Sequence, residues 1–365
     1  MNENYLDWQY ISSLDGNIDL PYALQIFADL HIHHMNNCAE YRHIITSLFR
    51  DLPSKFPTLG LLPYLPVSLF KTYDLISAPH ENIVKCMNSS GTTGSPSKIF
   101  LDKKNAYDQK KSLSNIFLNS ISHTRPYLGV LDSDSLIKNR SDSGFNARKA
   151  GVIGFSQLCR KPTFLLDPDL KFDAKFLSDL IAVASGKPIV FYGFTSVIWR
   201  ALASMKGSLS LSLKRKLSNC SLIHGGGWKN LQALNVSNND FKDLINDKLG
   251  ISNVINYYGM IEQTGSIFME CEHGYLHENS TTYILPRKIS DLSVCEEPGH
   301  TYPCVAQVFS LLPTSYPGFS LLTDDLIQLV HQDTCPCGRP GKAFLIPGRL
   351  QKVEVRGCSD AYSLV

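Results

Sequence analysis

The sequence lacks long apolar runs and an excess of charge of either sign. No apolar stretch reaches the roughly 20 residues that a membrane-spanning helix needs, so we expect no stable membrane insertion. Lys and Arg number 35 against 33 Asp and Glu, and no five like charges follow one another. Because a nucleic-acid binder needs a concentrated basic face, we expect no nucleic-acid partner. The N-terminus carries acids and aromatics where a signal peptide has basic and then apolar residues, which favours a cytoplasmic protein.

Internal repeats and low-complexity linkers are also missing. The 365 residues are 43% hydrophobic and 19% charged, which excludes a disordered chain and a coiled coil. A chain of this length buries a large core in one large or two ordinary domains.

The middle of the chain alternates between strand-like and helix-like patterns. Residues 187–194, 221–228 and 252–259 are short apolar runs typical of strands, while 196–207 and 239–249 have helical periodicity, the latter ending at Gly250. This alternation predicts an α/β fold with mixed, mainly parallel sheets covered by helices. Before it, residues 1–75 contain two segments with helical periodicity, 20–37 and 39–52, and predict an N-terminal helical cap. In such sheets ligands bind beyond the carboxyl ends of the strands.

A loop rich in Ser, Thr and Gly is the most informative segment. It spans Asn88–Lys98 and reads NSSGTTGSPSK. Its glycines let the backbone approach an anion closely, and its N–H and O–H groups donate to phosphate oxygens. It is not a Walker A loop, because Gly-Lys-Ser/Thr is missing at the required spacing. Taken alone, the segment is equally compatible with a mobile surface loop.

Three later motifs place charged side chains after apolar runs. Glu262 follows YYG and suits a Mg²⁺ that bridges to phosphate, or is a solvated glutamate after a strand. Asp324 and Asp325 suit recognition of ribose hydroxyls. Arg349 suits pairing with phosphate or ribose.

Ten cysteines are expected to be mostly reduced thiols, and six of them lie in the last hundred or so residues. Cys271-x-His273-x-x-x-His277, together with Cys335-Pro-Cys337, predicts a tetrahedral Cys₃His zinc site. The preferred ligands are Cys271, His277, Cys335 and Cys337, with His273 as a spare. The alternative is a group of reduced cysteines that pack as small hydrophobic side chains.

The order of these motifs resembles the adenylate-forming superfamily, and within it the phenylacetate–CoA-ligase-like branch. The matching segments are SSGTTGSPSK, HGGGWK, YGMIE, TDD and GRLQK, between residues 86 and 358. The chain is most similar to the acyl-protein synthetase family of bacterial bioluminescence, with which it shares its short length and an Arg-Gly-Cys near the C-terminus. Relatives in this branch also suggest a structural Zn²⁺ at similar places.

The resemblance implies a set of roles for individual residues. Glu262 would hold Mg²⁺, Asp325 the ribose of ATP, and Arg349 the ribose or a phosphate. Thr-Asp-Asp replaces the usual Thr-Gly-Asp, so the choice between Asp324 and Asp325 stays open. The ATP-binding residues would be Ser89, Ser90, Gly91, Thr92, Thr93, Gly94, Lys98, Gly226, Gly227, Tyr258, Gly259, Asp325 and Arg349.

The resemblance also implies a domain plan. A core would span residues 76–347, and residues 348–365 would form a truncated hinge or tail without the small C-terminal domain that carries a catalytic lysine. Lys352 is the nearby candidate to replace that lysine, with a solvated lysine as the alternative. Cys358 is the candidate acyl acceptor, because Lys352 and Arg356 provide the positive field that lowers a thiol pKa.

The function implied is ATP-dependent activation of a carboxylic acid, expected to be a fatty acid, to acyl-AMP. The acyl group would pass to a thioester on Cys358 and then to an acyl-reductase or acyl-carrier partner. The alternatives are an acyl-CoA ligase and an inactive scaffold member of the family. The cofactors implied are ATP, Mg²⁺ and a structural Zn²⁺.

Overall fold

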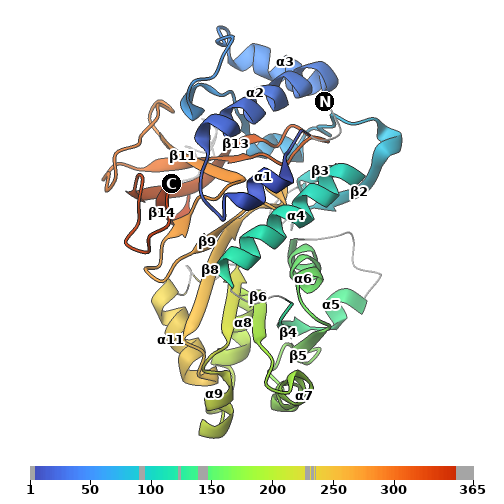
Figure 1. The fold of residues 1–365 in the computed structure, drawn as a ribbon, viewed down its shortest axis with the longest axis vertical. Coiled ribbons are helices and arrows are strands. Elements are labelled where there is room, and N and C mark those ends of the chain that lie inside the picture. Colours follow the sequence, from blue (N-terminus) through green and yellow to red (C-terminus); the bar gives the residue numbers. More distant parts are fainter. Residues whose placement is uncertain are drawn as a thin grey trace, which may run out of the picture.

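A large mixed sheet organises the molecule (Figure 1). The computed structural model describes residues 5–89, 95–121, 125–138, 147–226, 231, 234 and 236–350. Within these residues the sheet has twelve strands, in the order β11-β12-β13-β14-β10-β9-β8-β7-β6-β4-β5, with β1 paired to β13. The separate strands β2 and β3 form an antiparallel pair. The chain is therefore a mixed α/β protein, as its sequence predicts.

The parallel half of the sheet comes from the alternating middle of the sequence. It consists of β4 (Tyr127–Ser133), β5 (Pro162–Leu166), β6 (Ile189–Phe194), β7 (Ser221–Gly225) and β8 (Asn253–Gly259). The register pairs Tyr192 with Ile223 and Ile223 with Ile255, so neighbouring strands end at a common edge. The helices between and beside them are α5 (Ser135–Lys138), α6 (Ala147–Leu158), α7 (Ala174–Ala184), α8 (Thr195–Ala203), α9 (Leu211–Leu217) and α11 (Asn238–Leu249).

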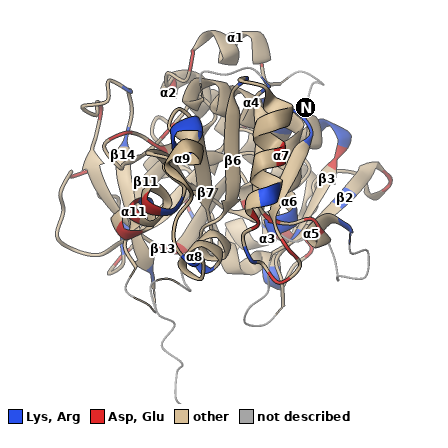
Figure 2. Cartoon of the chain, turned by 90° about the horizontal axis from the view of Figure 1, so that it is seen from below, with Lys and Arg blue, Asp and Glu red and all other residues tan. Residues whose placement is uncertain are grey.

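Helices cover both faces of the parallel half. Val190 and Tyr192 pack under α6 and α4 (Lys103–Ser120), whereas Phe191 packs under α7 and α8 on the opposite face. Figure 2 shows α4 and α8 on opposite sides of β6 and β7. Because both faces are buried, these strands are continuous apolar runs without polar alternation.

The other half of the sheet is antiparallel except for the short parallel pair of β1 and β13, so the mainly parallel arrangement predicted from the sequence describes β4–β8 but not the whole sheet. Its strands are β9 (Ile267–Glu270), β10 (Leu276–His277), β11 (Thr282–Lys288), β12 (Cys304–Ser310), β13 (Ser320–His331) and β14 (Ala343–Arg349). β9, β11, β12 and β13 each pair with the next strand along the chain, without an intervening helix, as antiparallel strands can.

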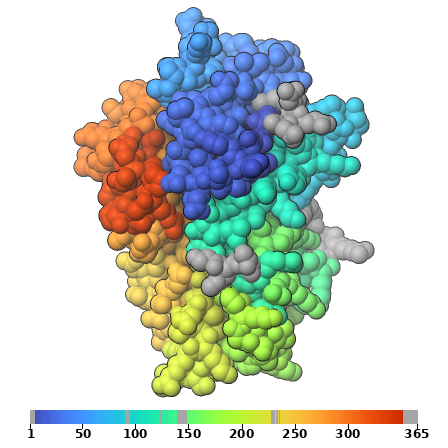
Figure 3. Space-filling model, viewed as in Figure 1, coloured from blue at the N-terminus to red at the C-terminus, as the bar shows by residue number. Residues whose placement is uncertain are grey.

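The N-terminal helices lie over this antiparallel half. They are α1 (Trp8–Ser13), α2 (Leu20–Asn37) and α3 (Ala39–Leu48). The Asp19 side chain caps α2 by accepting from the Tyr22 N–H, with Pro21 in the first turn. Phe27 packs against Tyr283 and Phe309, with ring centroids 5.8 and 5.5 Å apart. Figure 3 shows the N-terminal surface in direct contact with the C-terminal strands.

Short elements join the N-terminal helices to the β2–β3 pair. They are η1 (Leu59–Leu61), β1 (Leu65–Pro66), η2 (Val67–Lys71), η3 (His80–Asn82), β2 (Ile83–Asn88) and β3 (Lys98–Asp102). η2 packs against β3 and β13, so this connection lies between the β2–β3 pair and the large sheet. Among the described residues, no helix is both long enough and apolar enough to span a membrane.

Candidate functional site

Three of the predicted site residues meet in one hydrogen-bonded group. The Tyr258 hydroxyl donates to Asp325 Oδ2 at 2.7 Å, and Arg349 Nε donates to Asp325 Oδ1 at 2.7 Å. Asp325 and Arg349 are register partners on β13 and β14, while Tyr258 comes from the end of β8. Tyr258 lies on the parallel half and Asp325 on the antiparallel half, so the group forms where the two halves approach each other.

Protonation states fix this group at neutral pH. Burial raises the pKa of Tyr258 well above its ordinary value, and the nearby Asp325 charge adds to the effect. The hydrogen bond to Asp325 raises the pKa of Arg349. Tyr258 therefore donates as a neutral hydroxyl and Arg349 as a cation, and both oxygens of the Asp325 carboxylate have a partner.

The two aspartates of the TDD motif differ in their surroundings. Asp325 is 8% exposed and shares its group with Tyr258 and Arg349. Asp324 precedes it on β13, so its side chain leaves the opposite face of the strand, and its carbonyl accepts from the Leu350 N–H at 2.8 Å. Asp325 is thus the aspartate that faces the site.

Glu262 lies in η4 (Ile261–Gln263), directly after β8, and is 8% exposed. Burial raises the pKa of its carboxyl group, whereas the Ser97 hydroxyl and the positive charges of Arg349 and Lys71 act in the opposite direction. The carboxylate is therefore largely removed from water but within range of two cations. A hard divalent cation with oxygen ligands, such as Mg²⁺, is chemically suited to this environment.

The neck of the Ser/Thr/Gly loop is described by the structure. Ser89 donates its N–H to the Ser97 carbonyl at 3.0 Å, and its Oγ accepts from the Ser97 N–H at 2.8 Å. Ser97 is fully buried, whereas Lys98 is exposed and its Nζ pairs with Asp74 at 3.1 Å. Lys98 therefore pairs with Asp74 and not with Glu262. The loop residues Ser90, Gly91, Thr92, Thr93 and Gly94 lie outside the described residues.

Two glycines of the predicted site are packed so closely that a side chain would clash with a neighbouring residue. Gly226 has a φ of +69°, and a Cβ there would lie 2.8 Å from the Phe194 ring. At Gly259, a Cβ would lie 2.9 Å from Ile267. Gly227, Lys352 and Cys358 lie outside the described residues.

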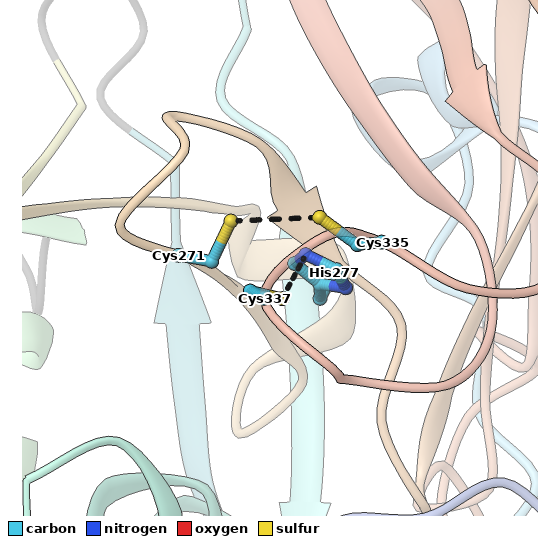
Figure 4. A group of neighbouring side chains, drawn as sticks. All are labelled: Cys271, His277, Cys335 and Cys337. Carbon is cyan, nitrogen blue, oxygen red and sulfur yellow. Dashed lines mark hydrogen bonds between the residues drawn. The ribbon is translucent and has the colours of Figure 1, made fainter.

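The predicted zinc ligands lie together in a second cluster (Figure 4). One ligand atom from each of Cys271, His277, Cys335 and Cys337 lies within 4.8 Å of the others. The Cys271 and Cys335 sulfurs are 4.0 Å apart, and Cys337 Sγ is 3.5 Å from His277 Nε2. His273 is not a member of the group.

Strand pairing positions this Cys/His cluster. His277 on β10 pairs with Met269 of β9 on one side and with Ala343 of β14 on the other. Cys271 follows β9, and the turn carrying Cys335 and Cys337 precedes β14. Three sheet-bound segments therefore converge on one point, although about sixty residues separate His277 from Cys335 in the sequence.

The electrostatics of the Cys/His cluster favour neutral groups when no cation is present. Burial raises the pKa of Cys271, raises that of Cys335 to about 12, and lowers that of His277 to about 4. Three sulfurs and one imidazole nitrogen form a tetrahedral donor set typical of structural Zn²⁺. The residues present therefore fit the metal.

A further group, Cys295, His300 and Cys304, was not found by sequence reasoning. Its histidine already uses both ring nitrogens. Nδ1 donates to the Tyr302 carbonyl at 2.9 Å, and Nε2 accepts from the Leu329 N–H at 3.4 Å. Neither nitrogen is available to a metal without breaking a hydrogen bond, which favours a structural role.

Comparison with known proteins places these sites in a family. The model of the family described as acyl-protein synthetase, LuxE, matches residues 21–364. The chain belongs to this family. Long-chain-fatty-acid–luciferin-component ligases are among its relatives. The one from Vibrio harveyi is 23% identical and covers 91% of this chain and 84% of its own length. The one from Aliivibrio fischeri is 24% identical, and the match covers 89% of this chain and 84% of the relative.

Solved structures agree on the fold. 2-Hydroxyisobutyryl-CoA ligase, in an open conformation with its acyl-AMP and CoA, has a TM-score of 0.66 at 16% identity and covers 98% of this chain and 83% of its own. The same enzyme in its postadenylation state has a TM-score of 0.67, with 96% and 73% covered. The fold is that of adenylate-forming ligases, and with the family it identifies an ATP-dependent acid ligase.

Sequence reasoning did not single out three residues around Glu262. Ser97 belongs to the recognised loop but carries no motif signal of its own, and Lys71 lies in the irregular N-terminal connection. Tyr316 lies in an apolar run, and burial together with the nearby Glu262 charge raises the pKa of its hydroxyl. Only tertiary packing brings them together.

Proposed function

We propose that the protein converts a fatty acid and ATP into acyl-AMP and pyrophosphate, and then transfers the acyl group to its own Cys358. The observation that carries this proposal is the Tyr258–Asp325–Arg349 group beside the buried Glu262 carboxylate. Family membership supports the reaction class, and the names of the two relatives support a long-chain acid as substrate.

In the first step a carboxylate oxygen of the acid attacks the α-phosphorus of ATP. The bond from that phosphorus to the bridging oxygen breaks, and pyrophosphate leaves with the electron pair. Asp325 is held by Tyr258 and Arg349 with its oxygens fixed, which suits acceptance of ribose hydroxyl protons. Arg349 places positive charge where phosphoryl oxygens gain negative charge.

Glu262 supplies the fixed carboxylate of the phosphate site. Mg²⁺, when bound, neutralises charge on the phosphate oxygens and the leaving pyrophosphate. Burial makes the charged form of Glu262 unfavourable, and a bound cation would offset this cost. The role of Glu262 is therefore to hold the cation. The β- and γ-phosphates are assigned to the loop residues Ser89, Ser90, Gly91, Thr92, Thr93, Gly94 and Lys98. Gly226, Gly227 and Gly259 are assigned to close backbone approach.

In the second step the Cys358 thiolate attacks the carbonyl carbon of acyl-AMP, a thioester bond forms, and AMP leaves. Lys352 and Arg356 favour the thiolate by their charge. The thioester is then passed to a partner protein, such as an acyl reductase or an acyl carrier. An acyl-CoA ligase is the competing assignment, because CoA would accept the acyl group by the same chemistry.

Two measurements test this proposal. Acid-dependent ATP–pyrophosphate exchange reports the first step and is expected in the wild-type protein. Labelled acid should remain on the denatured protein in a bond that hydroxylamine cleaves. Exchange without retained label, together with acyl-CoA formation when CoA is added, would favour the ligase assignment. No exchange with any fatty acid would contradict the adenylation step itself.

We also propose that Cys271, His277, Cys335 and Cys337 bind a structural Zn²⁺. The support is their mutual distance, their burial and the Cys₃His donor set. Elemental analysis of protein purified without added zinc should find one zinc per chain. A metal-free protein whose cluster thiols are freely alkylated would refute the assignment.

A further inference from the structure

Two buried hydroxyl groups beside Glu262 have no hydrogen-bond partner within the part of the chain that the structure describes. They are Ser97 Oγ and the Tyr316 hydroxyl, and both residues are 0% exposed. Neither atom has a partner among the described residues. The proposed mechanism assigns no role to Tyr316 and only a general one to the loop that contains Ser97.

Packing fixes the Tyr316 ring against the segment that carries Glu262. A Cβ added at Gly318 would lie 2.3 Å from the Tyr316 ring and 2.8 Å from the Glu262 carbonyl oxygen, so both flank the same glycine. Gln263 Nε2 donates to the Gly318 carbonyl at 2.8 Å and joins the two segments. Phe70 also meets the Tyr316 ring edge-on, with the ring centroids 6.2 Å apart.

Ser97 reaches Glu262 from the neck of the Ser/Thr/Gly loop. The hydrogen bond between its N–H and Ser89 Oγ holds its backbone in place. Its hydroxyl acts on the Glu262 carboxyl group and favours the ionised form, but the contact lacks the geometry of a hydrogen bond. Glu262 therefore lies close to two hydroxyl groups but forms a hydrogen bond with neither of them.

Other buried tyrosines of this chain show what a purely structural hydroxyl does. Tyr192 and Tyr257 pair their hydroxyls at 2.9 Å, and the Tyr41 hydroxyl is 3.0 Å from His31 Nδ1. A buried hydroxyl without a partner destabilises the fold relative to phenylalanine, so its presence favours a partner from outside the protein. A phenylalanine at 316 would fill the same space without that cost.

We propose that Tyr316 and Ser97 are positioning residues that hold water molecules of the hydrated divalent cation bound at Glu262. The inference rests on the proposed function. Mg²⁺ gives up its waters reluctantly and usually keeps several, bound by one or two carboxylates plus substrate phosphates. Hydroxyl oxygens accept hydrogen bonds from such waters, while the Glu262 carboxylate contacts the ion. The two hydroxyls thus fix the hydration shell and, through it, the place of the ion.

The test measures metal binding rather than turnover. Mn²⁺ replaces Mg²⁺ and is titrated, with detection by electron paramagnetic resonance, into protein saturated with an ATP analogue that has a methylene between its α- and β-phosphates. Tyr316→Phe and Ser97→Ala should each weaken Mn²⁺ binding by about tenfold, the equivalent of one hydrogen bond. Binding of the analogue in EDTA should stay at the wild-type value, because the hydroxyls do not contact the nucleotide.

Matched controls remove a paired hydroxyl elsewhere. Tyr41→Phe and Ser112→Ala delete hydroxyls bonded to His31 and Thr281, and both should leave Mn²⁺ affinity unchanged. Tyr316→Phe should not lower thermal stability without ligand, whereas Tyr41→Phe should. If Tyr316→Phe does not fold, the same titration with Ser97→Ala decides.

Three outcomes separate the possible failures. Wild-type Mn²⁺ affinity in both site variants would overturn the inference. An equal loss of analogue binding in EDTA would also overturn it, because the hydroxyls would then bind phosphate directly. Wild-type Mn²⁺ affinity in Glu262→Gln would show that the proposed function misplaces the ion, which is a different failure.

Discussion

Replacement of Asp325 by Asn tests whether this residue recognises the nucleotide. The asparagine keeps the shape of the side chain. Its oxygen can still accept from Arg349 Nε, and its amide group can donate to the Tyr258 hydroxyl, which rotates to accept. Fold and contacts should therefore survive, while the negative charge and one acceptor are lost.

The structure sets the magnitude. The Tyr258–Asp325 hydrogen bond is largely buried and joins a hydroxyl to a charge, so it contributes about 1.5–3 kcal/mol. The Arg349 side chain is 60% exposed, so water screens its pairing and the contribution is at most about 1 kcal/mol. Asp325→Ala removes both and should lower the free energy of unfolding by about 2–4 kcal/mol. Asp325→Asn should lose less than about half of that.

Exchange activity should behave differently from stability. Loss of a charged contact to ribose hydroxyls should lower kcat/KM for ATP about a hundredfold in both variants, equivalent to about 2.7 kcal/mol. Acid-dependent ATP–pyrophosphate exchange and urea unfolding measure the two effects separately. Asp324→Asn is the matched control and should retain exchange. Wild-type exchange in Asp325→Asn, or an equal loss in Asp324→Asn, would show that the ribose lies elsewhere.

Three further predictions concern other parts of the proposal. Glu262→Gln should lose exchange about a hundredfold, yet unfold at a higher temperature than wild type at pH 8. Burial raises the pKa of Glu262 in the fold, so wild-type stability falls as pH rises above the ordinary value near 4.5, and the difference from Gln should shrink on going from pH 8 to pH 5. Cys358→Ser should keep exchange but lose the hydroxylamine-labile acyl label, and retained label would exclude Cys358 as acceptor. Cys335→Ser should lose bound zinc and unfold at a lower temperature, whereas Cys295→Ser should keep the metal. Equal zinc content in both would contradict the assignment.

Local patterns were sufficient for much of the helical and parallel structure. The spacing of apolar residues predicts a helix over 20–37, and α2 occupies Leu20–Asn37 because Asp19 caps its first turn. The helix predicted over 239–249 begins one residue earlier, at the capping box of Ser237 and Asp240, and ends at Gly250 with φ +74°. In both cases the stop and start signals lie within a few residues of the helix.

The antiparallel half could not be predicted in the same way. β12 is buried at every position and therefore shows no alternation of apolar and polar residues. β10 has only two residues, and its pairing with β14 joins positions nearly seventy residues apart. Such pairing depends on the three-dimensional arrangement of the sheet, which a single sequence does not display.

The candidate site follows the same division. Motif order was sufficient to select Glu262, Asp325 and Arg349, because each follows a recognisable apolar run. The hydrogen bond that joins Tyr258 to Asp325, and the burial of Tyr316 beside Glu262, depend on the approach of β8 to β13. The candidate residues could therefore be selected from the sequence, but the side chains that contact each of them could not.

The junction between the two halves of the sheet explains why the site lies where it does. Glu262 directly follows β8, the last parallel strand, and Gly259 ends that strand. Asp325 and Arg349 lie on neighbouring antiparallel strands and face the same edge. Under the proposed function, a nucleotide bound there would contact both halves at once, and a shift of one half against the other would separate Glu262 from Asp325. Because the Tyr258–Asp325 hydrogen bond crosses the junction, it links the two halves at this point.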